Sequence, residues 1–413
     1  EEATWTMTTV LRSDDMRRLN RLRIIQMVRR KGAISRSEIA QAVALSPATV
    51  STISNDLITE GVLTARGNDA APNTGRGRPS IHLSVNPGFR HAVLIILKIG
   101  AINISIVDYA GAIVAHQDFH IDMATIAMDE FRATLIAEIR QTWQASGLPG
   151  DQLARISVGI QGTTDIAGQK LLRSPMTPLT DSPVARWLED EFGAPARLTN
   201  DCDLIARALN WRDPERYREN FAAILLAHGV GMGLFLRGNI INGTKSSGTE
   251  FGHMLHRPGG ALCRCGARGC IEANAGDYAI VRRYRGDPEN TAPASHVTAA
   301  EIAEIAEAAR GQNTRALDAL AAAGRALGSG LAGIYALVDP FRSAFVGHGV
   351  AAFEFMEPAL REILENSNAN AAKDIPIDLF PDDLPLVLEG CRIDALSEID
   401  AIQAERLGEQ ARA

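Results

Sequence analysis

The chain has 413 residues, of which 46% are hydrophobic and 22% charged, and this length fits about two or three globular domains. No apolar run approaches the roughly 18 residues of a membrane span, no secretory signal is visible, and the five cysteines favour a reducing cytoplasm. Residues 1–90 contain 13 Lys and Arg against 8 Asp and Glu, a balance of +5, whereas the rest contains 29 against 41, a balance of −12. A basic head on an acidic body favours a polyanion as the partner of the head.

Three short helices are predicted in the basic head. The first covers residues 19–31, where apolar residues recur at helical spacing, and Gly32 ends it. Ser35 and Glu38 form a Ser-x-x-Glu capping box, which predicts a second helix that runs to about Ala44. The head is therefore expected to be a compact helical domain, and its third helix carries the most specific signals.

The third helix of the head is the predicted DNA-recognition helix. Ser46 caps it and Pro47 occupies its first position, where a missing N–H costs nothing. Val50, Ile53 and Leu57 share the inward face. Small polar side chains at the exposed start of such a helix can approach base edges in the major groove. The residues predicted to face DNA are Ser46, Thr49, Ser51, Thr52 and Asn55.

Residues 62–86 predict two short strands joined by a long polar loop, the wing of a winged helix-turn-helix domain over residues 14–86. Within the loop, Arg76 and Arg78 belong to an Arg-Gly-Arg-Pro segment that can lie in a narrow, A·T-rich minor groove. By itself this tetrapeptide is typical of a flexible linker. The alternative for the whole head is a small helical protein-interaction domain, but helix caps, wing and positive charge together favour binding of double-stranded DNA.

The acidic body alternates strands and helices, which indicates an α/β domain. Strands are predicted at residues 92–100, 102–111, 112–119, 154–162, 196–200 and, as a strand–turn–strand, 221–243; helices are predicted at 131–147 and after Asp201.

A histidine and three cysteines recur at a spacing typical of metal sites. His253, Cys263, Cys265 and Cys270 follow the pattern H-x9-C-x-C-x4-C. One imidazole and three thiolates form a closed, four-coordinate set that suits structural Zn2+. The alternative is a reduced, cysteine-rich turn without metal. The remaining cysteines, Cys202 and Cys391, are predicted to be core residues.

The segment from Gly248 to Glu272, GTEFGHMLHRPGGALCRCGARGCIE, resembles the Glu-x-Gly-His and CxCGxxGCxE pattern of the ROK family (repressors, open reading frames and sugar kinases). The likeness extends from about Leu19 to the C-terminal helix and is greatest to the NagC/XylR-like transcription-regulator branch. It implies two actin-like, sugar-kinase-like (ribonuclease H-like) lobes with a sugar cleft between them. Lobe 1 would cover residues 87–199, completed by a C-terminal helix at 393–411, and lobe 2 would cover 200–392 with the zinc site.

The same resemblance implies which residues surround a sugar. They are Asn200, Asp201, Glu250, His253 and Glu272, with His253 also binding zinc through one nitrogen. Carboxylates and an amide suit vicinal hydroxyls, which need acceptors and donors. Two alternatives stay open: Asp201 only caps the helix that follows it, and Glu250 and Glu272 are hydrogen-bonding partners of the zinc ligands.

The turns that hold ATP phosphates in kinases of this family are altered. Asp-x-Gly-Gly-Thr is replaced by residues 98–102, KIGAI, and Gly-Thr-Gly-x-Gly by residues 227–233, AHGVGMG. A third glycine turn reads Gly347-His348-Gly349. These changes predict that the protein is not an enzyme and has no catalytic residue, so that Asp201, the general base of the kinases, would bind a sugar hydroxyl instead. Gln161-Gly162 in place of Pro-Gly, and Met176 in place of Asn, leave the sugar unidentified.

The resulting hypothesis is a sugar-responsive transcription regulator, a repressor of genes for carbohydrate uptake or catabolism. A homodimer or homotetramer would bind an A·T-rich inverted repeat, with structural Zn2+ and a sugar or sugar phosphate as effector. One alternative is an ATP-dependent ROK-type sugar kinase with an added DNA-binding head. Another is a regulator with a vestigial cleft that is controlled by a protein partner.

Overall fold

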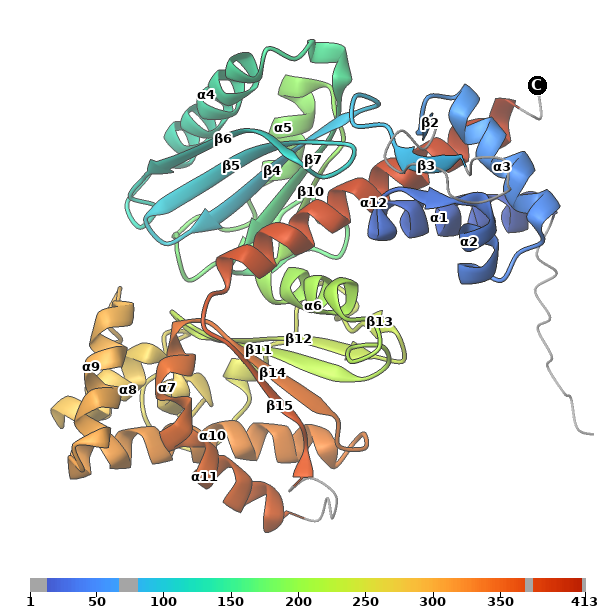
Figure 1. Cartoon of the computed structure of the whole chain (residues 1–413). Coiled ribbons are helices and arrows are strands. Elements are labelled where there is room, and N and C mark those ends of the chain that lie inside the picture. Colours follow the sequence, from blue (N-terminus) through green and yellow to red (C-terminus); the bar gives the residue numbers. More distant parts are fainter. Residues whose placement is uncertain (1–12, 67–80, 368–373, 411–413) are drawn as a thin grey trace, which may run out of the picture.

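The protein consists of two lobes and a small N-terminal domain, the head, which packs beside the long C-terminal helix (Figure 1). The computed structural model describes residues 13–66, 81–367 and 374–410. The predicted α/β architecture with a winged helix-turn-helix at its N-terminus is confirmed. Among the described residues, no helix is both long and apolar enough to cross a membrane.

The head contains three helices and a three-stranded sheet. Its elements are α1 (Ser13–Lys31), β1 (Ile34–Ser35), α2 (Arg36–Ala42), α3 (Pro47–Thr59), β2 (Leu63–Arg66) and β3 (His82–Val85), with strand order β1-β3-β2. Ser35 and Glu38 make both hydrogen bonds of the predicted capping box, and Ser46 accepts from the N–H of Thr49. α2 ends two residues earlier than predicted, since Ala44 has φ +51°, outside the helical region.

The predicted wing is described in its two strands only. β2 and β3 pair antiparallel, with Ala65 opposite Leu83. The connecting residues 67–80, which include Arg76 and Arg78, lie outside the described residues. The minor-groove role of both arginines therefore stays a prediction.

Each lobe is built on a five-stranded sheet of the same topology. Lobe 1 contains β4 (His91–Lys98), β5 (Ala101–Asp108), β6 (Ile113–His120), β7 (Leu153–Ile160) and β10 (Ala196–Asn200), in the order β10-β7-β4-β5-β6. Lobe 2 contains β11 (Phe221–Leu226), β12 (Val230–Leu236), β13 (Asn239–Ile240), β14 (Arg342–Val346) and β15 (Ile377–Phe380), in the order β13-β12-β11-β14-β15. In both sheets the three strands that come first in the chain form an antiparallel meander. The two later strands are parallel to the first strand and lie on its other side. This repetition agrees with the two-lobed fold that the sequence resemblance implied.

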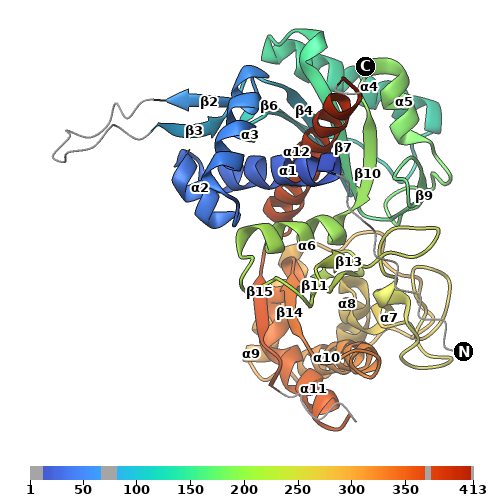
Figure 2. The ribbon, with the colours of Figure 1, turned by 90° about the vertical axis from the view of Figure 1, so that its right-hand side faces the viewer.

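Helices cover both faces of each sheet (Figures 1 and 2). In lobe 1, α4 (Met128–Ser146) and α5 (Val184–Phe192) cover one face and α12 (Leu384–Gln410) the other. In lobe 2, α6 (Asp201–Arg212) covers the face toward lobe 1, and the opposite side carries α7 (Glu272–Ala275), α8 (Asp277–Arg285), α9 (Ala299–Arg310), α10 (Thr314–Tyr335) and α11 (Phe353–Glu365). The hairpin of β8 (Thr163–Thr164) and β9 (Leu171–Arg173) extends from lobe 1 to the 245–247 segment of lobe 2. The two lobes are thus in contact beside the helices α6 and α12.

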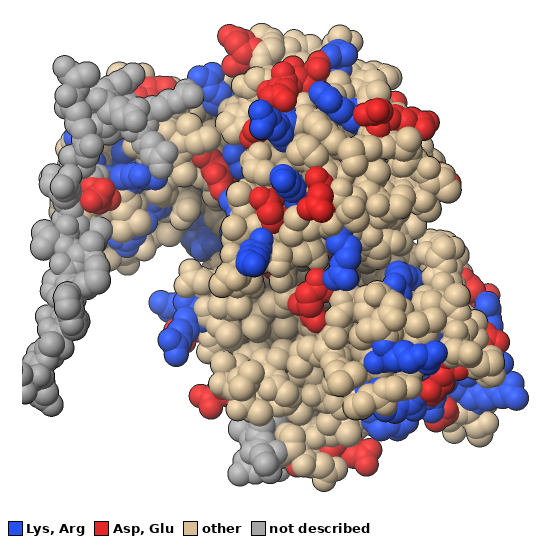
Figure 3. Space-filling model, turned by 180° about the vertical axis from the view of Figure 1, so that it is seen from behind, with Lys and Arg blue, Asp and Glu red and all other residues tan. Residues whose placement is uncertain are grey.

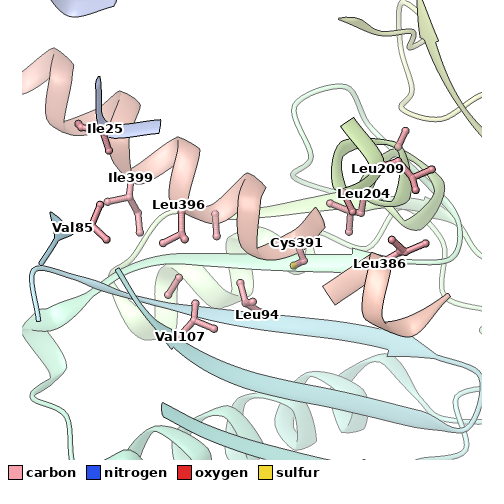
Figure 4. Close-up of a cluster of buried hydrophobic side chains, with 14 of the residues drawn as sticks. Ile25, Val85, Leu94, Val107, Leu204, Leu209, Leu386, Cys391, Leu396 and Ile399 are labelled. Atoms are coloured by element: carbon pink, nitrogen blue, oxygen red, sulfur yellow. The ribbon is translucent and has the colours of Figure 1, made fainter. Parts of the chain in front are cut away.

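The C-terminal helix α12 joins the cores of head and body. It begins at Leu384, nine residues before the predicted start. Gly390 within it packs against α6, where an added Cβ would lie 2.0 Å from the Leu204 carbonyl oxygen. Figure 4 shows Leu396 and Ile399 of α12 beside lobe 1 and the head. Burial of a side chain of this size contributes about 1.5–3 kcal/mol, so the head is packed onto the body by a shared core.

The surface of the body carries mixed charge. Figure 3 shows acidic and basic side chains intermingled over the rear of both lobes, with Lys and Arg most concentrated on one corner of lobe 2. On α8, Arg283 pairs with Asp318, and Arg285 pairs with Glu301. These two pairs offset the positive charge of both arginines of α8.

Candidate functional site

His253 and the three cysteines converge on one point in lobe 2. Their ligand atoms all lie within 4.8 Å of one another. Nδ1 of His253 is 3.7 Å from Sγ of Cys263, and the Sγ atoms of Cys265 and Cys270 are 3.8 Å apart. A tetrahedral ion with bonds of about 2.3 Å to sulfur separates its ligands by about 3.8 Å. The cluster is therefore compatible with structural Zn2+.

Glycine permits the turn that brings Cys270 back to His253. Gly269 has φ +83°, and an added Cβ would lie 1.7 Å from the carbonyl oxygen of Arg257. Leu255 and Cys270 then pair as an isolated β-bridge. The close return of the chain brings Cys270 toward His253, which ends a short 3₁₀ helix (Phe251–His253).

Glu272 connects the cysteine cluster to the turn between β11 and β12. Its Oε1 lies 3.7 Å from Cys263 Sγ and accepts from the hydroxyl of Tyr278 at 3.2 Å, and its Oε2 accepts from the N–H of Val230. Burial, and then the Glu272 carboxylate, raise the pKa of Cys263, so a thiolate there needs a compensating cation. The contacts of Glu272 match those of a hydrogen-bonding partner of the zinc ligands, although the residue also lines the cleft.

One cleft between the lobes collects all five residues predicted to surround a sugar. It has a volume of about 180 Å³, and its wall includes Asn200, Asp201, Glu250, His253 and Glu272. These residues come from the β10–α6 junction and from the 250–272 segment, which are far apart in the sequence but adjacent in the fold. The structure thus brings the predicted constellation together.

Asn200, not Asp201, caps α6. The Asn200 Oδ1 accepts from the N–H groups of Cys202 and Asp203, and its Nδ2 donates to the Gly162 carbonyl oxygen. Asp201 is buried in the first turn and accepts from the N–H of Cys202 at 2.9 Å. Burial, and then the carboxylate of Asp383, raise the pKa of Asp201 to about 7.

Glu250 bridges the lobes. From lobe 2, its Oε1 accepts from Thr163 at 2.8 Å and from Arg173 at 2.9 Å, both in lobe 1. Its Oε2 lies 3.6 Å from Nε2 of His253. Because the side chain of Glu250 is 49% exposed, the carboxylate remains accessible from the cleft.

Sequence reasoning missed several polar residues of the cleft. Arg173, Thr163, Ser247 and Arg264 line it. The signal available for Arg173 was its place directly before Ser174-Pro175. Met176, which stands where the family commonly has Asn, packs in the core of lobe 1.

At the three turns that the sequence analysis compared with the phosphate-binding turns of kinases, side chains contact other parts of the chain. At the end of β4, Lys98 pairs with Asp383 at 3.0 Å. Between β11 and β12, Nδ1 of His228 lies 3.2 Å from Asp277, and Nε2 of His348 lies 3.7 Å from the same carboxylate oxygen. Burial opposes ionisation of Asp277, but the two histidines outweigh it and lower the pKa of Asp277.

The exposed face of α3 carries the polar residues predicted to face DNA. Ser46, Thr52 and Asn55 are exposed, whereas Thr49 and Ser51 are half-buried. The Asn55 Oδ1 accepts from Arg36, a residue of α2 that the sequence analysis missed. Arg36 adds positive charge beside the recognition helix, as expected for a phosphate contact.

The class of protein is defined by its fold, a winged helix-turn-helix head on a two-lobed body with duplicated sheets. Comparison with known proteins identifies the family. Residues 97–383 match the model of the ROK family, and residues 17–64 match the winged helix-turn-helix DNA-binding model. The chain therefore belongs to the ROK family.

Two of the matched relatives are regulators of similar length. The DNA-binding transcriptional dual regulator NagC of Escherichia coli (strain K12) is 25% identical over 369 residues, 88% of this chain and 89% of that protein. The putative xylose repressor of Caldicellulosiruptor sp. (strain Rt8B.4) is 22% identical over 330 residues, 79% of this chain and 82% of that protein. A crystal structure of a ROK family transcriptional regulator, a homolog of the E. coli MLC protein, has the same fold, with a TM-score of 0.75 at 23% identity over 94% of this chain and 98% of that one.

Proposed function

We propose that this protein is a sugar-responsive transcription regulator that represses genes for carbohydrate uptake or catabolism in the cytoplasm. One observation carries the proposal: a capped recognition helix and a polar interlobe cleft occur in a single packed chain. The names of the relatives support it, since they include an N-acetylglucosamine repressor and a putative xylose repressor.

The head binds double-stranded DNA in this proposal. Two heads of a homodimer contact the half-sites of an A·T-rich inverted repeat, with α3 in the major groove. Base edges and phosphates are contacted from Ser46, Thr49, Ser51, Thr52 and Asn55, and the minor groove from Arg76 and Arg78.

The cleft binds a sugar or a sugar phosphate. Glu250 offers an exposed acceptor, and Asp201, with its pKa near 7, offers either a donor or an acceptor at neutral pH. Asn200 has one N–H left for a ligand, because its other polar positions serve α6 and Gly162. A ligand held between the lobes favours the arrangement to which it binds more tightly, and only that difference in affinity can change DNA binding.

Structural Zn2+ is proposed at His253, Cys263, Cys265 and Cys270. The metal would hold Nδ1 of His253 and direct its Nε2 toward Glu250 in the cleft, consistent with the distances at both nitrogens. The role of the ion is then to fix the ligand-binding wall rather than to take part in a reaction.

The proposed regulator does not transfer phosphate from ATP. Kinases hold ATP phosphates on glycine turns through open backbone N–H groups. Here Lys98 replaces the acidic residue of the first turn, and His228 and His348 close on Asp277 at the other two. These contacts support a role in regulation instead of phosphoryl transfer.

A thermal-shift screen tests the proposal, with purified protein, a panel of neutral sugars, sugar phosphates and ATP, and zinc measured on the same sample. Ligand that binds the native state raises Tm by mass action. We expect one sugar class to raise Tm, ATP to leave it unchanged, and about one zinc per chain. A shift with ATP, with sugar-dependent ADP release, would favour the kinase, whereas no shift with any sugar would move the search to a protein partner.

A further inference from the structure

Two adjacent arginines at the end of α1 attach the head to two different parts of the body. Arg29 donates two hydrogen bonds to Asp400 of α12, with N–O distances of 2.5 and 3.0 Å. Arg30 lies over the indole ring of Trp211, the penultimate residue of α6, with its guanidinium carbon 4.5 Å from the ring centroid. The first contact is with α12, which covers lobe 1, and the second is with α6, which covers lobe 2 and also packs along α12.

The contact with lobe 1 is a buried ion pair. The Asp400 side chain is 0% exposed and that of Arg29 is 8% exposed. Tyr109, directly after β5, donates to the same carboxylate, and its ring lies 4.7 Å from the Arg29 guanidinium carbon. Burial raises the pKa of Tyr109, so its hydroxyl remains a donor. Bidentate geometry with a second donor makes this contact specific in orientation.

The contact with lobe 2 is made at the far end of a tightly packed helix. α6 begins at the cleft with Asp201 and ends at Arg212, directly after Trp211 beside the head, a length of about 18 Å. Its first turn touches β12 so closely that a Cβ on Gly233 would lie 2.2 Å from the Cys202 carbonyl oxygen. α6 therefore has no free space on this side, and a shift of its first turn must move the whole helix.

We propose that α6 transmits a change in the cleft to the DNA-binding head. Trp211 is the positioning residue that passes the shift to Arg30, and the Arg29–Asp400–Tyr109 cluster is the pivot on lobe 1. A ligand that changes the angle between the lobes then reorients α1 and, with it, the recognition helix. The inference rests on the proposed function, because it supplies the connection between cleft and DNA.

An engineered crosslink tests this connection without an identified effector. The hydroxyl oxygens of Thr164 in lobe 1 and Ser247 in lobe 2 are 2.6 Å apart, so T164C/S247C places two thiols where a disulfide can lock the lobes together. The full-length T164C/S247C protein, oxidised or reduced, is titrated with a duplex that the wild-type protein selects from a random-sequence pool. Hydrogen exchange of α1 is followed in the same samples and needs no DNA.

The crosslink is combined with three substitutions: W211A, W211F, which keeps an aromatic ring for Arg30, and W143A, a half-buried control tryptophan on α4. We expect the ratio of Kd between the oxidised and the reduced protein to be at least about fivefold. This ratio should be unchanged in W143A and largely retained in W211F. In W211A, which removes the aromatic ring, it should fall to about twofold or less. An unchanged ratio in W211A, or no effect of oxidation without it, overturns the proposal. If the protein binds no duplex, the proposed function fails, and hydrogen exchange of α1 then tests the connection alone. An effect of oxidation on this exchange that W211A abolishes supports the connection. An effect of oxidation that is the same with and without W211A refutes it.

Discussion

The proposed ligand side of the cleft and the turns at residues 98–102, 227–233 and 347–349 differ in how their polar side chains are paired. On the ligand side, Glu250 is half-exposed and Asp201 holds a carboxyl with its pKa near 7 at the cleft wall. On the other side, Asp277 lies between two histidines and Lys98 pairs with Asp383. One region keeps groups available for a ligand, and the other uses its groups to bind the chain to itself.

Under the proposed function, this difference would let the fold bind a ligand without transferring phosphate. A closed turn held by side chains contributes to stability, because its charged groups are paired within the protein. Carboxyl groups in a cleft that face solvent or carry raised pKa values are not fully paired within the protein. They therefore stabilise the fold less, but they remain able to bind a ligand. Four substitutions test this contrast, from the largest expected effect to the smallest.

Loss of a proposed zinc ligand has the largest expected effect, on the proposed ligand side. We predict that C265S lowers bound zinc below one per chain and the free energy of unfolding by more than about 3 kcal/mol, because metal binding is coupled to folding. Metal analysis and urea unfolding measure both quantities. A267S, an exposed change in the same loop, is the control. Full zinc retention in C265S would show that Cys265 is not a zinc ligand and would contradict the proposed zinc site.

Neutralising Asp201 is predicted to stabilise the protein at high pH. Because its folded pKa of about 7 lies above the ordinary value of 3.8, the folded state binds the proton more tightly, and stability falls as pH rises between those values. D201N should therefore raise the free energy of unfolding at pH 8 by up to about 4 kcal/mol, with no gain below pH about 4. Urea unfolding across pH measures this gain, with the exposed D129N as control. A gain that does not depend on pH contradicts the raised pKa.

On the side of the closed turns, D277N is predicted to destabilise the protein. Asn lacks the negative charge of the Asp277 carboxylate, which lies beside the two histidines. The free energy of unfolding at pH 7 should therefore fall by about 1–3 kcal/mol. Because the folded pKa of Asp277 is lowered, its contribution is present above the ordinary pKa and is lost as pH falls through the folded value. Thermal unfolding of D277N is compared with that of the exposed D287N. Unchanged stability would show that this side is not held by Asp277.

The smallest expected effect is at Lys98. Its ion pair with Asp383 is partly exposed, so K98M should change the free energy of unfolding by less than about 1 kcal/mol. Lys98 also lowers the pKa of Asp201, so its removal should raise that pKa further. Comparing the pH dependence of K98M with that of wild type measures this coupling. A larger loss of stability than at Asp277 would reverse the order of importance proposed for the turns.

The sequence predicted those parts of the molecule that have local signals. Ser35, Glu38 and Ser46 form the predicted caps, because capping depends on residues three positions apart. The start of α12 lies nine residues before the predicted one. Gly390, a poor interior helix residue by propensity, lies inside this helix, where the backbone of α6 packs against it. Tertiary contact therefore overrode the local signal.

The candidate site was predictable in its residue types but not in its connections. The spacing from His253 to Cys270 encodes a cluster, whereas Arg173 and Glu250 meet across the lobes from positions 77 residues apart. No local pattern could indicate that Met176 packs in a core instead of lining the cleft. Contacts between lobes depend on the fold as a whole, so sequence periodicity does not contain them.

The most direct test of the regulator is the affinity for DNA with and without a sugar. Kd for a duplex selected by the wild-type protein is measured at fixed ionic strength with each sugar and sugar phosphate of the panel, and with ATP. We predict that one sugar class changes Kd at least about fivefold and that ATP has no effect. No preference for any duplex over random DNA, or a Kd that no sugar alters, would contradict a sugar-responsive DNA-binding regulator.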